Sequence, residues 1–165
     1  MIANDLVFDF NQQSNISKWL IVDDVVMGGK SFGSFSLNKN GHGEFAGDVS
    51  LENNGGFSSV RYLINKEDME HYSKFSLKIR GDEKAYQFRV KTNYSDYHSY
   101  IFTFQTTKEW QTIEIPFLEM YPAFRGRKLN MNKYQGRQLQ EIAFLIGNKK
   151  NESFKLEIDR IELSL

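Results

Sequence analysis

The segment KFSLKIRGDEKAYQFRVK (residues 74–91) shows the pattern that decides the fold. The apolar side chains at alternate positions are Phe75, Leu77 and Ile79 in its first half and Tyr86, Phe88 and Val90 in its second. Successive side chains of a β-strand point to opposite faces of a sheet, so this alternation predicts two strands, each with one buried face. Gly81 and Asp82 lie between the two runs and indicate a turn.

The same alternation recurs along the whole chain. Further strands are expected in residues 6–10, 31–37, 45–51, 57–63, 98–105, 110–117, 142–147 and 154–163. About ten short strands separated by glycine and asparagine turns are typical of a β-sandwich or barrel. Only residues 65–73 and part of 120–140 leave room for a short helix, and no repeat or linker interrupts the chain. The sequence therefore predicts one all-β domain over residues 1–165.

Composition agrees with this class and excludes several functions. The chain contains 14 Phe and 8 Tyr, which suit a pleated surface, and no Cys, which excludes disulfides and thiolate metal sites. Basic and acidic residues balance at 21 each, so no global field attracts nucleic acid or anionic lipid. The opening MIANDLVFDF has neither a secretory nor a transit pattern, and no run is long and apolar enough to span a membrane. We expect a cytoplasmic protein without membrane insertion.

One long connection, residues 116–140, lacks a clear strand pattern. Connections of this length are usually functional or carry local structure. The connection is basic and aromatic, with Arg125, Arg127, Lys128, Lys133 and Arg137 interleaved with Tyr121, Phe124 and Tyr134. This composition is typical of a surface for single-stranded nucleic acid, but the zero net charge argues against nucleic acid, and an acidic protein surface fits equally well.

The stretch SLENNGGFSSVRY (residues 50–62) combines polar residues with turn residues. Asn54, Gly55 and Gly56 predict a turn that requires positive φ, while Glu52 and Asn53 offer polar groups to exposed backbone. Arg61 follows on the face shared by Phe57, Ser59 and Leu63. A partly buried guanidinium requires an oxygen partner, so we expect Arg61 to pair with Glu52, Asp24 or Asp23 and to organise this end of the fold.

Catalytic and metal-binding patterns are weak in comparison. Asp24 and Glu52 are candidates for a glycosidase pair, but capping carboxylates explain them more simply. The sequence GGKS at residues 28–31 ends like a phosphate-binding loop, yet the required first glycine is replaced by Asp24. The three histidines have no metal spacing, so neither a metal nor a cofactor is expected.

Two long segments resemble the family of complex I intermediate-associated proteins. They are WLIVDDVVMGGKS (residues 19–31) and FAGDVSLENNGGFSSVR (residues 45–61), supported by WQTIEIPF (110–117), FRGR (124–127) and FKLEIDRI (154–161). Members are assembly factors for the respiratory NADH dehydrogenase. The resemblance implies a galactose-binding-like jelly roll, a fold also used by carbohydrate-binding modules, and a non-enzymatic role with protein partners such as respiratory-chain subunits.

These observations predict a binding or assembly module and the residues of its site. The candidate binding residues are Asp24, Gly28, Gly29, Glu52, Asn53, Asn54, Arg61, Arg125 and Arg127. The alternative is a carbohydrate-binding module that stacks sugars on Tyr94, Tyr97, Tyr121 or Trp110. A hydrolase that uses Asp24 and Glu52 is a third possibility.

Overall fold

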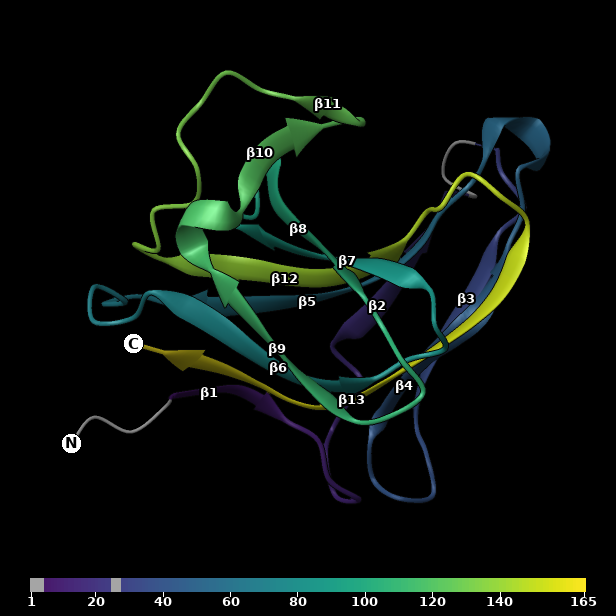
Figure 1. Cartoon of the computed structure of the whole chain (residues 1–165), viewed down its shortest axis with the longest axis horizontal. Coiled ribbons are helices and arrows are strands. Elements are labelled where there is room, and N and C mark those ends of the chain that lie inside the picture. Colours follow the sequence, from purple (N-terminus) through teal and green to yellow (C-terminus); the bar gives the residue numbers. More distant parts are fainter. Residues whose placement is uncertain (1–4, 25–27) are drawn as a thin grey trace.

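The computed structural model describes residues 5–24 and 28–165, which form an all-β structure (Figure 1). Thirteen strands lie in these residues, and two of their connections are short 3₁₀ helices, η2 (Glu52–Asn54) and η3 (Phe117–Glu119). The predicted fold class is confirmed. Neither residues 65–73 nor residues 120–140 contain a helix.

One layer is an antiparallel sheet of six strands. In order, five of its strands are β3 (Phe32–Leu37), β4 (Gly43–Val49), β13 (Glu152–Ser164), β6 (Lys74–Arg80) and β9 (Gln111–Pro116). The sixth, β1 (Asp5–Asp9), pairs with the second half of β13, with Asp5 opposite Leu163. The 13-residue β13 is therefore the centre of this sheet, because it carries β4 and β1 along one edge and β6 along the other.

The second layer is an antiparallel sheet of seven strands. Its order is β11 (Arg127–Lys128), β10 (Tyr121–Phe124), β8 (Ser99–Gln105), β7 (Ala85–Lys91), β12 (Leu139–Ile146), β5 (Ser58–Lys66) and β2 (Trp19–Asp23). The two strands expected in residues 74–91 are both present, but β6 and β7 belong to different sheets. The turn at Gly81 therefore carries the chain from one layer to the other.

The core lies between the two sheets and takes its side chains from the alternate positions of both. Fully buried members include Phe45, Phe75, Leu77, Ile79, Phe88, Ile142, Phe144, Leu156 and Ile158. At one edge Trp19 of the seven-stranded sheet stacks on Phe35 of the six-stranded sheet, with ring centroids 5.1 Å apart. Aromatic packing therefore joins the two layers where β2 and β3 meet.

The long connection expected from the sequence contains η3, β10 and β11 before it returns to β12. Tyr134 is fully buried, and its ring lies 5.0 Å from Phe117 and 5.3 Å from Tyr100. Its hydroxyl donates to the carbonyl of Gln138 (2.8 Å). The loop of residues 129–138 is thus fastened to the core by one tyrosine, which confirms that this connection has local structure.

Candidate functional site

Asp24 lies at the centre of a buried hydrogen-bond cluster. One carboxylate oxygen accepts the backbone N–H of Ser31 (2.9 Å), and the other accepts the Ser31 hydroxyl (2.5 Å) and the N–H groups of Gly56 (2.6 Å) and Phe57 (3.3 Å). The side chain is completely inaccessible to solvent. The carboxylate therefore satisfies the backbone of two separate loops rather than facing a cleft.

Hydrogen bonding also sets the ionisation of this carboxylate. Burial alone would raise the pKa of Asp24, but the bonds from Ser31, Gly56 and Phe57 outweigh it and leave the pKa below its usual value. Donors that point at a carboxylate favour its charged form. Asp24 is accordingly charged at neutral pH and held in place by its donors.

The glycines of both motifs make room for this carboxylate. A Cβ atom on Gly29 or on Gly55 would lie 2.4 Å from atoms of the Asp24 carboxyl group, far inside contact distance. Gly55 has an ordinary φ of −75°, and the positive φ values of the turn fall on Asn53 (56°) and Gly56 (140°). The expected need for positive φ is therefore correct for Gly56 and wrong for Gly55, which is required for space.

Asp23 forms a second, neighbouring link. Its carboxylate accepts the N–H of Gly33 in β3 (2.9 Å) and the hydroxyl of Ser58 in β5 (2.5 Å). It therefore ties the edge strands of the two sheets together, beside the Trp19 stack. Residues 25–27, the Val-Val-Met of the motif, lie outside the described residues.

The expected pair between Arg61 and an acidic residue is wrong. Glu52 is exposed, while Asp23 and Asp24 are bound by hydroxyl and backbone donors. Arg61 is half-buried as expected, but it lies on the outer face of the seven-stranded sheet, opposite Ala143 of β12. The sequence could not indicate this, because the partner of a side chain on a sheet depends on which strands are neighbours.

A second arginine flanks the same alanine. Arg89 of β7 lies opposite Ala143 on the other side, so the register across the sheet reads Arg61, Ala143, Arg89. Burial lowers the pKa of Arg89 to about 10, and the charge of Arg61 contributes to the lowering. Its Nε donates to Gln87 (2.8 Å), and neither arginine forms an ion pair with any described residue.

Arg125 and Arg127 lie elsewhere, on the hairpin formed by β10 and β11. Arg125 (φ 50°) and Gly126 (φ 78°) form its two-residue turn, and Phe124 pairs with Arg127. Positive φ at both turn residues matches the twist of a tight hairpin. Figure 1 shows this hairpin rising from the seven-stranded sheet, well separated from η2. The candidate site residues are therefore divided among three places: the loops around Asp24, the outer face of the seven-stranded sheet at Arg61, and this hairpin.

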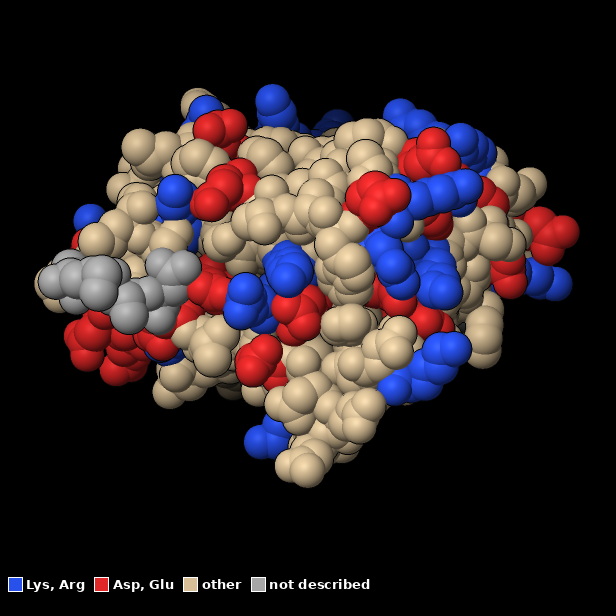
Figure 2. All heavy atoms as spheres, turned by 60° about the horizontal axis from the view of Figure 1, so that its bottom comes forward, with Lys and Arg blue, Asp and Glu red and all other residues tan. Residues whose placement is uncertain are grey.

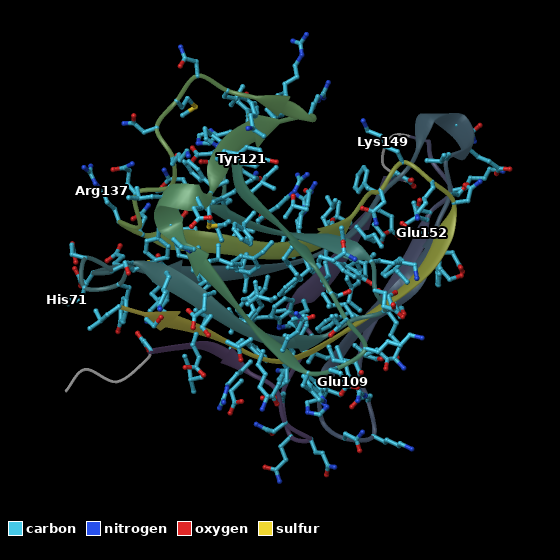
Figure 3. The ribbon with its side chains drawn as sticks, viewed as in Figure 1. His71, Glu109, Tyr121, Arg137, Lys149 and Glu152 are labelled. Atoms are coloured by element: carbon cyan, nitrogen blue, oxygen red, sulfur yellow. The ribbon has the colours of Figure 1, made fainter. Side chains whose placement is uncertain are left out.

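An apolar hollow lies beside this hairpin. It is lined by Tyr97, His98, Phe124 and Leu129, with a volume of about 370 Å³. Tyr97 is 85% exposed, and its ring lies 6.0 Å from Phe124. Tyr121, which Figure 3 places at the start of β10, is covered by Lys128 (4.7 Å from Nζ to the ring centre). Trp110 contacts His42 and Arg80 instead, so of the four aromatic candidates Tyr94 and Tyr97 are the exposed ones.

The described residues hold neither a group of metal ligands nor a membrane-spanning helix. They contain no group of three histidine or carboxylate side chains that could hold a metal ion. None of the described helices is long and apolar enough to cross a membrane.

The chain belongs to the complex I intermediate-associated protein 30 family, whose family model matches residues 8–158. Curated relatives include the proteins named complex I intermediate-associated protein 30, mitochondrial, of Drosophila melanogaster (27% identity) and Mus musculus (21%). The matches cover 96% and 94% of this chain but 62% and 55% of those proteins, so the chain spans about three fifths of their length.

Solved structures with the same fold include carbohydrate-binding modules. A family 11 module of a Clostridium thermocellum cellulase superposes with a TM-score of 0.73 at 18% identity, covering 99% of this chain and 95% of the module. A mutant of a family 29 module gives a TM-score of 0.55 at 10% identity, covering 99% and 92%. At this identity the likeness shows the fold alone, and it confirms the predicted jelly roll.

Proposed function

We propose that this chain is a non-enzymatic binding and assembly module that holds a protein partner, with respiratory-chain subunits as the first partners to test. The family match over residues 8–158 carries the proposal, since the relatives it groups are named for an intermediate of complex I. Because the chain spans only part of those relatives, its partner is inferred and not transferred. The fly and mouse relatives are named mitochondrial, so the cytoplasmic location expected from the sequence stays a prediction.

The chemistry of the described residues supports binding over catalysis. Asp24, the first of the two carboxylates considered for hydrolysis, is buried and fully engaged, and Glu52 is exposed. A carboxylate pair for glycoside hydrolysis must flank a substrate cleft, which this arrangement does not provide. We therefore assign Asp24, Gly28 and Gly29 to holding the loop, and Glu52 and Asn53 to its exposed surface.

The β10–β11 hairpin is the part of the candidate site that is best placed to contact a partner. Arg125, Arg127 and Lys128 are exposed, and the Arg125 guanidinium lies 5.2 Å from the exposed ring of Phe124. Arginine and aromatic side chains are enriched at the centres of protein interfaces.

A pull-down from native lysate tests the proposal. The wild-type chain is compared with Arg125→Ala/Arg127→Ala, and captured proteins are identified by mass spectrometry. Lys39→Ala/Lys108→Ala is the matched control, because it also removes two exposed positive charges, at turns away from the hairpin. We expect the hairpin variant alone to lose respiratory-chain subunits. Equal capture by all three proteins would contradict the proposed surface, and capture of none would contradict the function.

A carbohydrate-binding function is the second candidate, favoured by the hollow at Tyr97. Exposed aromatic rings beside an apolar hollow suit stacking on a sugar ring. A glycan array separates the two functions: wild-type signals that Tyr97→Ala removes would support sugar binding, and an array without signal above background would eliminate it.

A further inference from the structure

The outer faces of the two sheets differ in whether their basic side chains form ion pairs. On the six-stranded sheet the basic side chains are paired: Arg80 with Glu157 (2.6 Å), Arg160 with Glu162 (2.9 Å) and Lys74 with Glu114 (3.3 Å). Figure 2 shows this side of the molecule, with basic and acidic side chains intermingled. On the seven-stranded sheet Arg61 and Arg89 have no such partner among the described residues.

Register brings these two arginines over one small side chain. Both lie opposite Ala143, so two strand spacings of roughly 4.8 Å separate their backbones, within reach of the two long side chains. Ala143 is only 2% exposed although it points away from the core, because its longer neighbours cover it. Two half-buried positive groups therefore share one location, with a cost in desolvation and repulsion that a bound anion would relieve.

The other charged groups of this face leave the arginine pair uncompensated. Glu141, two residues before Ala143 on β12, is 8% exposed and forms no ion pair with a described residue. Lys91 donates to the backbone carbonyl of Asp96 (2.7 Å), and the Asp96 carboxylate accepts the N–H of Asn93 (3.3 Å). Lys128 covers Tyr121 at the end of the same row of the sheet.

Apolar side chains surround the pair, and two of them are exposed. Leu20 of β2 lies opposite Arg61 and is 56% exposed, and Leu63, two residues after Arg61, is 53% exposed. Ile101 of β8 lies opposite Arg89 on the other side and is buried, with 4% of it exposed. A ligand for this surface needs carboxylates for the arginine forks and apolar side chains for the leucines, a combination that a peptide has and a sugar chain lacks.

We propose that Arg61 and Arg89 form an anion-binding pair on the outer face of the seven-stranded sheet, which takes a carboxylate from an acidic, leucine-containing segment of a protein partner. This inference rests on the proposed protein-binding function and adds the chemistry of the partner. It adds to the β10–β11 hairpin a second contact surface in the middle of the sheet, where Leu20 and Leu63 are exposed.

Isothermal titration calorimetry with a defined peptide tests the inference. The probe is a capped Glu-Leu-Glu-Glu-Leu-Glu peptide, compared with its Gln-for-Glu counterpart, inorganic phosphate and trigalacturonate, at low salt to limit screening. We expect the acidic peptide to bind at least about tenfold more tightly than the Gln peptide, and Arg61→Gln/Arg89→Gln to remove that difference. Lys74→Gln/Arg160→Gln, which removes two charges from the other sheet, should bind as the wild type does.

Two further measurements separate the alternatives. Thermal unfolding of Arg61→Gln should show an unchanged or higher Tm, since repulsion is relieved, whereas a lower Tm with unchanged peptide binding would show a structural arginine and overturn the proposal. Equal peptide binding by the Arg61→Gln/Arg89→Gln variant overturns it too, and tighter binding of trigalacturonate than of the peptide overturns the choice of a peptide.

In the lysate pull-down, partners retained by this variant contradict the inference while the proposed function stands. Peptide binding together with an empty wild-type pull-down contradicts the proposed function alone.

Discussion

Asp24 holds three positions of the chain together with one side chain. Its carboxylate accepts hydrogen bonds from Ser31, Gly56 and Phe57, and Gly29 and Gly55 leave the space that it occupies. The two motifs that carry the family resemblance therefore meet at one atom group.

Asp24→Asn tests the role of the charge at this point. The amide that replaces one oxygen would face N–H groups, so at least one buried donor loses its acceptor. We expect a loss of about 2–4 kcal/mol in the free energy of unfolding, measured by urea denaturation at neutral pH. A loss below about 0.5 kcal/mol, the range of an ordinary surface substitution, would contradict the role assigned to the cluster.

Acid should act through the same group. Because hydrogen bonding lowers the pKa of folded Asp24, its stabilising contribution is complete above the unfolded value, near 3.9, and is lost as the pH falls through the folded pKa. We expect the free-energy difference between wild type and Asp24→Asn to shrink between neutral pH and about pH 3. A constant difference over that range would show that the carboxylate's charge is not involved.

Gly55→Ala separates crowding from backbone strain. A methyl group at Gly55 collides with the Asp24 carboxyl at an ordinary φ, whereas Gly28 (φ 88°) has open space for a Cβ. We expect a loss of about 3 kcal/mol for Gly55→Ala from overpacking and about 1 kcal/mol for Gly28→Ala from its positive φ. Equal losses in chemical denaturation would contradict the steric role of Gly55.

The sequence predicts which residues are special, but it does not predict which groups their side chains contact in the fold. The glycine-rich turns and the half-buried Arg61 could be identified because glycine frequency and strand alternation are local properties. The partner of Asp24 could not, since backbone N–H groups carry no mark in a sequence. The guanidinium of Arg89 was missed because its strand reads like any other alternating run.

At the scale of single elements, the loop of residues 129–138 depends on Tyr134. Its ring fills the end of the core, and its hydroxyl satisfies the Gln138 carbonyl. We expect Tyr134→Phe to cost about 1 kcal/mol for the lost hydrogen bond and Tyr134→Ala about 4 kcal/mol for the cavity. Urea denaturation of both variants checks the ratio, and similar costs would mean that the ring contributes little.

Strands with a clear alternation could be predicted from the sequence, and three strands without one could not. The strands β6, β7 and β9 each bury one face, so their sequences alternate, although β9 lies at the edge of its sheet. The edge strand β2 (WLIVD) reads as a short apolar run, β10 contains Pro122, and β11 has only two residues. Such elements exist because a neighbouring strand supplies hydrogen bonds, which no local pattern encodes.

At the scale of the whole molecule, one hydrophobic cluster spans both sheets, so we expect a single cooperative unfolding transition. Trp19 reports on the contact between the sheets, and Trp110→Phe makes it the single tryptophan probe of the chain. Its fluorescence and far-UV circular dichroism should change at the same urea concentration. Separate midpoints would show that the sheets unfold independently and would contradict the single-domain prediction.

The pairing of β1 with β13 bears on how this fold combines with other sequences. Asp5 and Leu163 face each other as neighbours in one sheet, and Figure 1 shows the start of β1 and the end of β13 on the same side of the molecule. A longer polypeptide can thus enter and leave the fold through adjacent positions, as an insertion into a host protein's surface loop requires. A circular permutant that joins these ends with a short linker and opens at Arg125–Gly126 should keep the same arrangement of strands.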